Sequence, residues 1–369
     1  MSFEYACAQD WGIVEGPIDQ AAVSAITSWG SNIVRVPLNE HCWLGVDDGA
    51  ATPQFVGEPY RQAVQTLVDL LIANGAYVIL DLHWSAPAGQ PAAGQQPMPN
   101  TSYSAAFWQS VANTFKGRDQ VVFDVFNEPV PNNNASDDTE EAARRSWECW
   151  RDGGTASCDA TLSLGPPESA MAASQAVGMQ TLVDAVRGTG ATNVILVGGI
   201  QWANTLWSSA AHNWLTYKPA DPLGNLAASV HVYPFARCTT VACYDNDIAP
   251  VAAQVPAIAG EFGIGGCDAA AAQWLNELMS WFDRHQVGYL AFVWNAPDSC
   301  TNGNLIADWG GTPSQYGQIY RDHLVSVRPS PTPPPTPVPT PTPTLTLAPI
   351  PSATPDPTPT LALDPTPSR

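Results

Sequence analysis

Two glutamates stand where their carboxylates could carry out acid–base chemistry. The segment VVFDVFNEPV, residues 121–130, starts like a buried strand and ends in Asn127, Glu128 and Pro129. Because proline has no backbone N–H, Pro129 prevents the strand from continuing beyond Glu128. Glu261 lies in the segment GEFG, at the end of another apolar run. Either glutamate alone could be a solvated turn residue, whereas two carboxyl groups brought together could act as an acid and a nucleophile.

Further polar and aromatic side chains lie at or near the ends of other apolar runs. They are Arg35 in NIVRVPL, His83 and Trp84 in YVILDLHW, His231 and Tyr233 in ASVHVYPF, and Trp294 in YLAFVWNA. One such residue could be a core histidine or a capped turn. Their recurrence at several strand ends instead indicates one active-site face, because the carboxyl ends of parallel barrel strands all open onto the same side.

The elements that would position these residues alternate along the chain. Apolar runs without polar alternation predict strands that are buried on both faces, at residues 32–38, 77–84, 121–129, 193–200, 228–235, 256–263 and 289–296. Apolar residues at helical spacing predict helices within 17–30, 60–75 and 268–288. This alternation fits a doubly wound sheet or a (β/α)8 barrel. No Gly-rich dinucleotide turn follows the first run, which favours the barrel.

Composition narrows the class of partner. The chain has 369 residues, a net charge of −20 and a pI near 4.3. This charge argues against nucleic acid and anionic membranes, which require lysine and arginine, and favours a neutral partner. The 14 tryptophans fit sugar stacking, although most tryptophans in proteins are simply core residues.

The strand-end residues resemble those of glycoside hydrolase family 5, the family of cellulases and mannanases, whose catalytic glutamates end strands four and seven of a TIM (β/α)8 barrel. The resemblance spans residue 3 to about residue 324 and is most specific at NEP and GEFG. It implies that Glu128 is the general acid/base and Glu261 the nucleophile, without metal or cofactor. It also implies a substrate-binding shell of Arg35, His83, Trp84, Asn127, His231, Tyr233 and Trp294.

The expected mechanism is double displacement with retention, for which the two carboxyl groups lie about 5 to 5.5 Å apart. Arg35 and the Tyr233 hydroxyl would keep Glu261 ionised. Burial and the neighbouring negative charge would keep Glu128 protonated. Asn127 would bond the sugar 2-hydroxyl, and Trp294 would lie under the sugar that is attacked.

The substrate is less well defined than the mechanism. An endo-β-1,4-glucan is the first expectation, β-mannan the second, and the substrate of an exo-acting glycosidase the third, because loops decide between them. A catalytically silent carbohydrate-binding barrel is the alternative class. The presence of both glutamates disfavours it.

The chain departs from the family pattern at its start. Seven strands are predicted instead of eight, and residues 1–16 read like the loop that follows a first strand. We therefore expect Met1 to be a misplaced or internal start, with strand one and an export signal encoded upstream. Without strand one, the barrel would keep two unpaired edges and an exposed seam.

Eight cysteines, with no C-x-x-C and histidine spacing, favour disulfides over a metal site. Cys149 with Cys158 and Cys238 with Cys243 would close short loops. Cys7 with Cys42 and Cys267 with Cys300 would join loops that follow adjacent strands.

Two regions are expected, a catalytic barrel at residues 1–328 and a disordered Pro/Thr-rich linker or stalk at 329–369. The protein is expected to be secreted and monomeric. It would act on a polysaccharide or oligosaccharide, with no nucleic acid partner and no membrane span, and its tail would tether it to a further module or surface.

Overall fold

A computed structural model describes residues 2–47, 52–134, 139–164, 170–264, 266–296 and 303–327. The predicted linker at 329–369 and the predicted half-cystine Cys300 lie outside these residues. No helix in the described part of the chain combines the length and apolar character needed to cross a bilayer.

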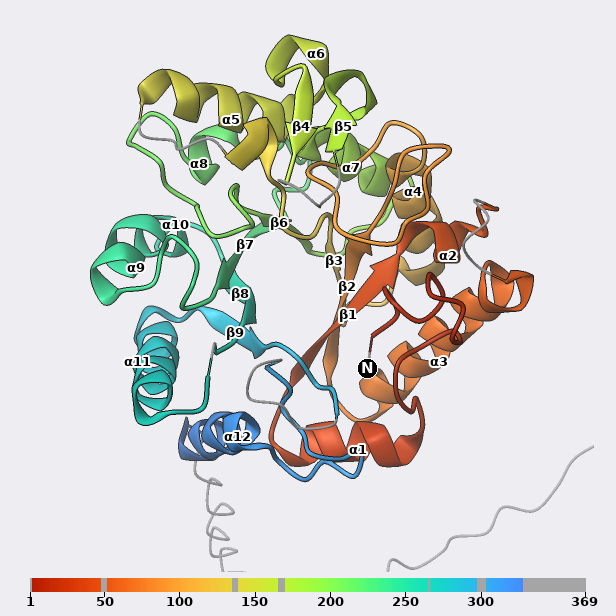
Figure 1. Cartoon of the computed structure of the whole chain (residues 1–369), viewed down its shortest axis with the longest axis vertical. Coiled ribbons are helices and arrows are strands. Elements are labelled where there is room, and N and C mark those ends of the chain that lie inside the picture. The colour runs from red at the N-terminus through yellow and green to blue at the C-terminus, as the bar shows by residue number, and fades with distance from the viewer. Residues whose placement is uncertain are drawn as a thin grey trace, which may run out of the picture. The chain divides into compact units, whose positions relative to one another are not determined.

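The fold is a (β/α)8-type barrel built on a seven-stranded parallel sheet with the order β1-β2-β3-β6-β7-β8-β9. The strands run in ring order with helices on the outside (Figure 1). The strand bounds are β1 Ile33–Asn39, β2 Tyr77–Trp84, β3 Val121–Asp124, β6 Ile195–Gly198, β7 Leu226–Val232, β8 Ala257–Phe262 and β9 Gly288–Ala291. All seven predicted strands are therefore present.

Of the remaining elements, α1 precedes β1, α12 follows β9, and the others lie in the connections between the strands. The helices are α1 Gln20–Ser28, α2 Glu40–Leu44, α3 Glu58–Ala73, α4 Ser104–Phe115, α5 Glu140–Asp152, α6 Gly154–Ser157, α7 Met179–Arg187, α8 Trp214–Tyr217, α9 Val241–Asp247, α10 Ala249–Ala252, α11 Ala269–His285 and α12 Gln315–Val327, with short 3-10 turns at Pro53–Phe55, Pro131–Asn134 and Ala173–Gln175. A small antiparallel hairpin, β4 Thr161–Ser163 with β5 Ala170–Ala172, was not expected from the sequence.

The helices form where their apolar stripes predict them. In α3, the stripe of Tyr60, Val64, Leu67, Val68 and Leu71 is fully buried. Burying such a stripe against the sheet supplies most of the stability of a short helix.

The helix α1 begins later than the start of the segment 17–30 in which it was predicted. The side chain of Asp19 caps the helix by accepting a hydrogen bond from the Ala22 N–H at 2.9 Å, so the helix begins at Gln20. Pro17 therefore precedes the cap.

Several strands end earlier than predicted: β6 ends at Gly198 and β7 at Val232, and the largest differences are at β3 and β9. The strand expected at 121–129 stops at Asp124, and Glu128 has a left-handed backbone with φ of 49°. The strand expected at 289–296 covers Gly288–Ala291. Glu128 and Trp294 therefore stand on the loops that follow β3 and β9, because neither backbone continues a ladder.

The sheet is open between β9 and β1, as predicted. These two strands approach each other, yet no hydrogen-bonded pairing joins them within the described residues. An apolar pocket lies between them, and its lining includes Ile33, Val34, Leu290 and Ala291.

The predicted disulfides Cys7–Cys42, Cys149–Cys158 and Cys238–Cys243 are present. Cys267 is also disulfide-bonded. Its predicted partner Cys300 is outside the described residues, so that pairing remains a prediction.

Candidate active site

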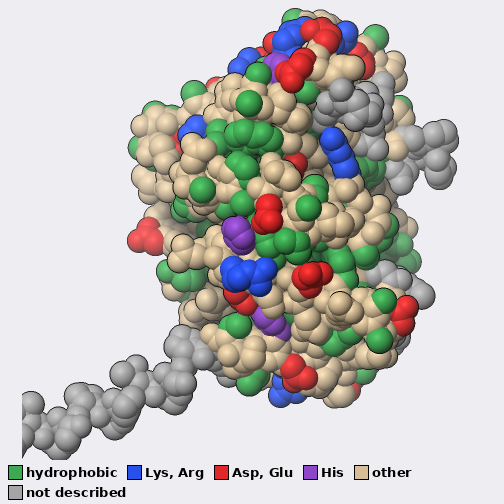
Figure 2. All heavy atoms as spheres, turned by 90° about the vertical axis from the view of Figure 1, so that its left-hand side faces the viewer, with side chains coloured by type: hydrophobic (Ala, Val, Ile, Leu, Met, Phe, Trp, Pro, Cys, Tyr) green, Lys and Arg blue, Asp and Glu red, His purple; other side chains and the backbone are tan. Residues whose placement is uncertain are grey.

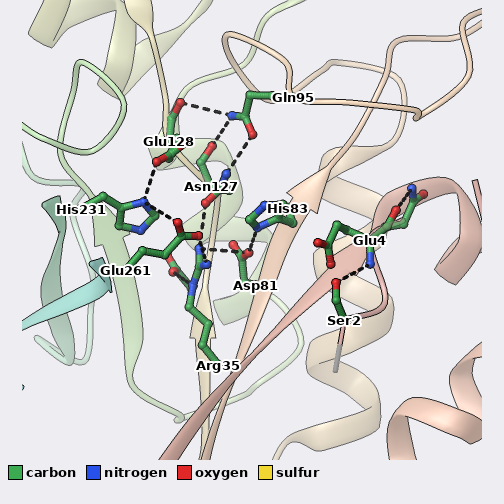
Figure 3. A network of polar contacts seen from close by, with 12 residues as sticks. Ser2, Glu4, Arg35, Asp81, His83, Gln95, Asn127, Glu128, His231 and Glu261 are labelled. Atoms are coloured by element: carbon green, nitrogen blue, oxygen red, sulfur yellow. Dashed lines mark hydrogen bonds and ion pairs between the residues drawn. The ribbon is translucent and has the colours of Figure 1, made fainter. Parts of the chain in front are cut away.

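The site is organised around Arg35, whose buried guanidinium reaches from β1 into the barrel (Figure 3). Its nitrogens lie 3.0 Å from Asp81 of β2, 3.0 Å from Asp124 of β3 and 2.6 Å from Glu261 of β8. It also donates a hydrogen bond of 3.0 Å to the Asn127 side chain. The guanidinium of Arg35 on β1 therefore contacts side chains from β2, from β3 and the loop after it, and from β8. The planar shape of the guanidinium, with donors on several sides, suits this role.

Glu261 is a buried carboxylate held in its charged form. Arg35 bonds its Oε1, and the Tyr233 hydroxyl donates to Oε2 at 2.8 Å. Burial opposes ionisation, but the positive charges of His231, Arg35 and His83 outweigh it and hold the pKa of Glu261 well below its usual range. The prediction that Arg35 and Tyr233 keep this carboxylate ionised agrees with these contacts.

Glu128 faces Glu261 across His231 (Figure 3). The His231 Nδ1 atom lies 2.9 Å from an oxygen of Glu128 and 3.7 Å from an oxygen of Glu261. Burial disfavours a charged His231, yet the negative charges of Glu261 and Glu128 raise its pKa above the usual value. His231 therefore lies next to both carboxylates, with the shorter contact to Glu128.

Asn127 is fixed from two directions. Its side-chain oxygen accepts from Arg35, and its Nδ2 donates to the Gln95 Oε1 at 2.9 Å. Gln95 in turn donates to the backbone oxygens of Asn127 at 2.7 Å and Glu128 at 3.2 Å. Gln95 therefore braces the loop that carries the acidic side chain.

His83, at the end of β2, belongs to the same polar cluster through Asp81. Its Nδ1 lies 2.7 Å from Asp81, and its ring stacks parallel to Phe292 at 6.5 Å between centroids. Burial would lower the pKa of His83, but the Asp81 charge and hydrogen bond raise it to about 9. His83 is therefore an imidazolium at neutral pH.

Two of the predicted site residues, Trp84 and Trp294, contact other aromatic rings. Trp84 contacts Tyr5 edge-on at 5.2 Å, and Trp294 contacts Trp29 edge-on at 4.7 Å. Arg35 and Trp294 line the same pocket between β1 and β9. The other predicted residues, Arg35, His83, Asn127, Glu128, His231, Tyr233 and Glu261, come together as expected.

Sequence reasoning missed Asp81, Asp124, Gln95 and Glu4. A signal for the aspartates was present, since each interrupts an apolar strand, and a buried carboxylate needs a cationic partner such as Arg35. Gln95 and Glu4 lie in irregular segments without such a signal. Burial raises the pKa of Glu4 to about 7 against the opposing charge of His83.

Within the described chain, one group of side chains is close enough to hold a metal ion. Single ligand atoms of Glu128, His231 and Glu261 lie within 4.8 Å of one another. The Arg35 guanidinium at 2.6 Å from Glu261 already neutralises that carboxylate and would repel a cation. The arrangement is better suited to proton transfer and nucleophilic attack.

Comparisons with known proteins identify relatives of this chain. The model of the family described as Cellulase (glycosyl hydrolase family 5) matches residues 2–298. A Beta-mannanase/endoglucanase A of Caldicellulosiruptor saccharolyticus is 24% identical over 313 residues, covering 82% of this chain and 19% of the relative. Endoglucanase 1 of Robillarda sp. (strain Y-20) is 26% identical over 247 residues, covering 60% of this chain and 52% of the relative. The chain thus spans at most about half the length of these two relatives.

Solved structures show the same fold. The endo-beta-1,4-glucanase Xac0029 from Xanthomonas axonopodis pv. citri superimposes with a TM-score of 0.57 at 19% identity, covering 84% of this chain and 90% of that one. A lichenase of Caldicellulosiruptor sp. F32, solved with cellotetraose, gives 0.58 at 17% identity, covering 84% of each chain. With the family model matching most of its length, this chain belongs to glycosyl hydrolase family 5.

Proposed function

We propose that the protein is a retaining glycoside hydrolase that cleaves β-linked polysaccharide. One observation carries the proposal: an oxygen of Glu128 and an oxygen of Glu261 lie within 4.8 Å of each other. Retaining enzymes hold their carboxyl groups about 5 to 5.5 Å apart, whereas inverting enzymes leave about 6.5 to 9.5 Å for a water molecule. The short separation supports direct attack by a carboxylate.

In this proposal, Glu261 is the nucleophile that attacks the anomeric carbon. Its ionised state is supported by Arg35, Tyr233 and His231. Glu128 gives a proton to the leaving oxygen and later takes one from the water that releases the sugar. Both steps need a carboxyl group whose proton can be exchanged, and the Glu128 side chain keeps 19% of its surface exposed.

The supporting residues act on the sugar or on the two carboxylates. In this proposal Asn127 bonds the 2-hydroxyl, a contact that strengthens in the transition state, and the hydrogen bond from Asn127 to Gln95 supports its orientation. His83 and Trp84 on β2 and Trp294 after β9 bind the sugar from the other strands. No metal and no cofactor takes part in this chemistry.

The substrate that we propose is an endo-cleaved β-1,4-glucan. The names of the relatives, endoglucanase and endo-beta-1,4-glucanase, support this choice. β-Mannan is the second candidate, because one relative is called both a beta-mannanase and an endoglucanase. The surface supports a neutral polymer: on the face in Figure 2, charges of both signs are interspersed and no basic patch spreads over it.

The test is a reducing-sugar assay on soluble glucans, mannans and xylans, followed by proton NMR of the first product. We expect activity on β-1,4-glucan and release of the β-anomer first. An α-anomer as the first product would contradict the proposed geometry. Activity on mannan alone would change the substrate and leave the mechanism standing.

We also propose that the enzyme works outside the cell as a monomer, tethered through residues 329–369. The disulfides support an oxidising compartment. Limited proteolysis should release the tail without loss of activity, and a tail that resists cleavage would contradict the tether.

A further inference from the structure

Gln95, in the segment between β2 and α4, contacts both residues that begin the reacting loop after β3. Its Nε2 donates to the backbone oxygen of Asn127 at 2.7 Å and to that of Glu128 at 3.2 Å, and its Oε1 accepts from the Asn127 Nδ2 at 2.9 Å. Figure 3 shows Gln95 on the side of Asn127 that is away from Arg35. One side chain therefore holds the backbone and a side chain of the loop that bears the proposed acid.

Only one assignment of the amide atoms fits these contacts. Arg35 can only donate, so the Asn127 atom that faces it at 3.0 Å is the side-chain oxygen, and the Nδ2 atom is left to face Gln95. The backbone oxygens of Asn127 and Glu128 can only accept, so the Gln95 atom that faces them is its Nε2. The hydrogen bonds therefore run in one direction, from Arg35 through Asn127 and Gln95 to the backbone of Glu128.

The backbone of Glu128 has a conformation that needs such support. Its φ of 49° is left-handed, and a residue with a Cβ adopts this conformation only at a cost in free energy. The two bonds from Gln95 to the backbone oxygens of this turn offset part of that cost. Because the backbone dihedral angles limit the side-chain rotamers, the direction of the Glu128 carboxyl depends on this turn.

The segment that carries Gln95 is itself held on both sides by other groups. Before Gln95, the side chain of Asn39 donates to the Ala92 oxygen at 2.7 Å. After it, the Val130 N–H donates to the Pro97 oxygen at 2.8 Å, and residues 96–100 are buried. The position of Gln95 is therefore fixed by contacts that its own side chain does not make.

We propose that Gln95 is a positioning residue for proton transfer, which directs the Glu128 carboxyl toward the oxygen of the leaving group. The proposal rests on the proposed function, because it concerns the proton that Glu128 gives to that oxygen. Glu261 is held without Gln95, since Arg35 and Tyr233 bond its two oxygens. Loss of the Gln95 side chain should therefore weaken acid catalysis and leave nucleophilic attack in place.

The experiment compares wild type with Gln95→Met on aryl β-cellobiosides that differ only in the leaving phenol. In the first step, the bond from the anomeric carbon to the phenolic oxygen breaks as the bond to Glu261 forms, and the proton of Glu128 goes to that oxygen. A phenyl group needs this proton, whereas a dinitrophenolate is a weak base and leaves without it. With Gln95→Met, kcat/KM should fall about a hundredfold on the phenyl glycoside and less than about threefold on the dinitrophenyl glycoside.

Methionine has nearly the length of glutamine but no donor, so the substitution removes the hydrogen bonds and keeps the volume. Activity on the dinitrophenyl glycoside, together with thermal unfolding, establishes that the variant folds. Gln95→Asn keeps an amide on a side chain that is one carbon shorter, and it should show the same selective loss to a smaller extent. It is the variant to measure if Gln95→Met does not fold.

Gln180→Met is the matched control. Gln180 of α7 also ties its element to the backbone of another segment, since it donates to the Ala220 oxygen at 3.0 Å and accepts from the Ala220 N–H at 2.7 Å. The control should leave the ratio of kcat/KM between the two glycosides unchanged. Equal losses on both glycosides in Gln95→Met would mean that Gln95 only supports the fold, and no loss on either would mean that Glu128 is positioned without it. Either result overturns the proposal.

The two proposals fail in different ways. A wild-type protein that hydrolyses neither glycoside and no β-glucan contradicts the proposed function, and the role of Gln95 with it. An active wild type whose ratio between the two glycosides is kept in Gln95→Met contradicts the role of Gln95 alone.

Discussion

Two buried glutamates beside the same barrel, Glu261 and Glu40, are held in opposite ways. Glu261 is bound by charged groups, with Arg35 at 2.6 Å and His231 at 3.7 Å. Glu40, at the start of α2, is bound by three neutral donors, and the His41 Nε2 atom lies 3.7 Å from its Oε2. Ser104 donates to it at 2.6 Å, Asn100 at 2.8 Å and the Ala86 N–H at 3.3 Å.

The difference appears in their acidity. Burial raises the pKa of Glu40 to about 7, and its hydrogen-bond donors together with the charge of His41 offset only part of that effect. For Glu261 the surrounding cations reverse the effect of burial, and its pKa falls. A well-satisfied buried carboxyl is thus not by itself a catalytic one. A nucleophile at neutral pH needs cations that keep it ionised, and this requirement separates the proposed nucleophile Glu261 from Glu40.

The largest expected effect is on turnover. Glu261→Gln and Glu128→Gln should each lower kcat by about 10⁴-fold or more, equal to about 5 kcal/mol of transition-state stabilisation, because each removes an obligatory reacting group. The measurement is kcat on the best β-glucan, with thermal unfolding to establish that the variants fold.

Glu40→Gln makes the same chemical change in the structural network and is the matched control. If Glu261→Gln kept activity close to that of wild type, Glu261 would have to be regarded as another structural glutamate.

The second largest effect is expected from changing Arg35, the cation that contacts Glu261. Arg35→Lys keeps a positive charge but loses the fork that contacts Asp81, Asp124 and Glu261 together. We expect kcat/KM to fall about a hundredfold and the free energy of unfolding to fall by about 3 kcal/mol.

Weaker contact with the cation should also raise the pKa of Glu261. The acidic limb of the kcat/KM profile against pH would then move to higher pH. An acidic limb that stays at the wild-type position would show that Arg35 does not hold Glu261 ionised.

Much of this could be predicted from the sequence, because the strands between the two edges of the sheet are buried on both faces and read as apolar runs. Apart from Arg35, which lies within β1, the predicted site residues stand at or near strand ends or just past them, and the fold brings most of them together. Gln95 and Glu4 could not be found in this way, since irregular loops position them and no periodic pattern records loop geometry. Strand ends were misplaced near Glu128 for the same reason, because its left-handed backbone is set by loop contacts.

The third effect tests His83, whose charge contributes to the field on Glu261. Its pKa is about 9 in the folded protein and about 6.5 in an unfolded chain. Because the folded value is raised, the stabilisation is fully present below about pH 6.5 and is lost as pH rises through about 9.

His83→Gln removes this titration. The difference in unfolding free energy between wild type and His83→Gln should shrink by about 3 kcal/mol from pH 6 to pH 10, measured by urea unfolding, and kcat/KM should fall about tenfold. A difference that does not change with pH would show that His83 is not charged beside Asp81.

The smallest effect on activity is expected for Glu40→Gln, the change that tests the comparison from its structural side. Ser104 and Asn100 can still bond a glutamine side chain, so kcat/KM should stay within about twofold of wild type.

Stability should respond to pH in the direction opposite to that of a catalytic carboxylate. The folded pKa of Glu40 is raised to about 7, so its stabilisation is complete below about pH 4.5 and is lost as pH rises through about 7. Glutamine does not titrate. The free energy of unfolding of the variant, measured with urea, should therefore rise relative to that of wild type between pH 5 and pH 9. If the free energy of unfolding of the variant instead fell relative to that of wild type over this range, Glu40 would be held as an anion like Glu261. Charged neighbours would then not distinguish the proposed nucleophile from a structural glutamate.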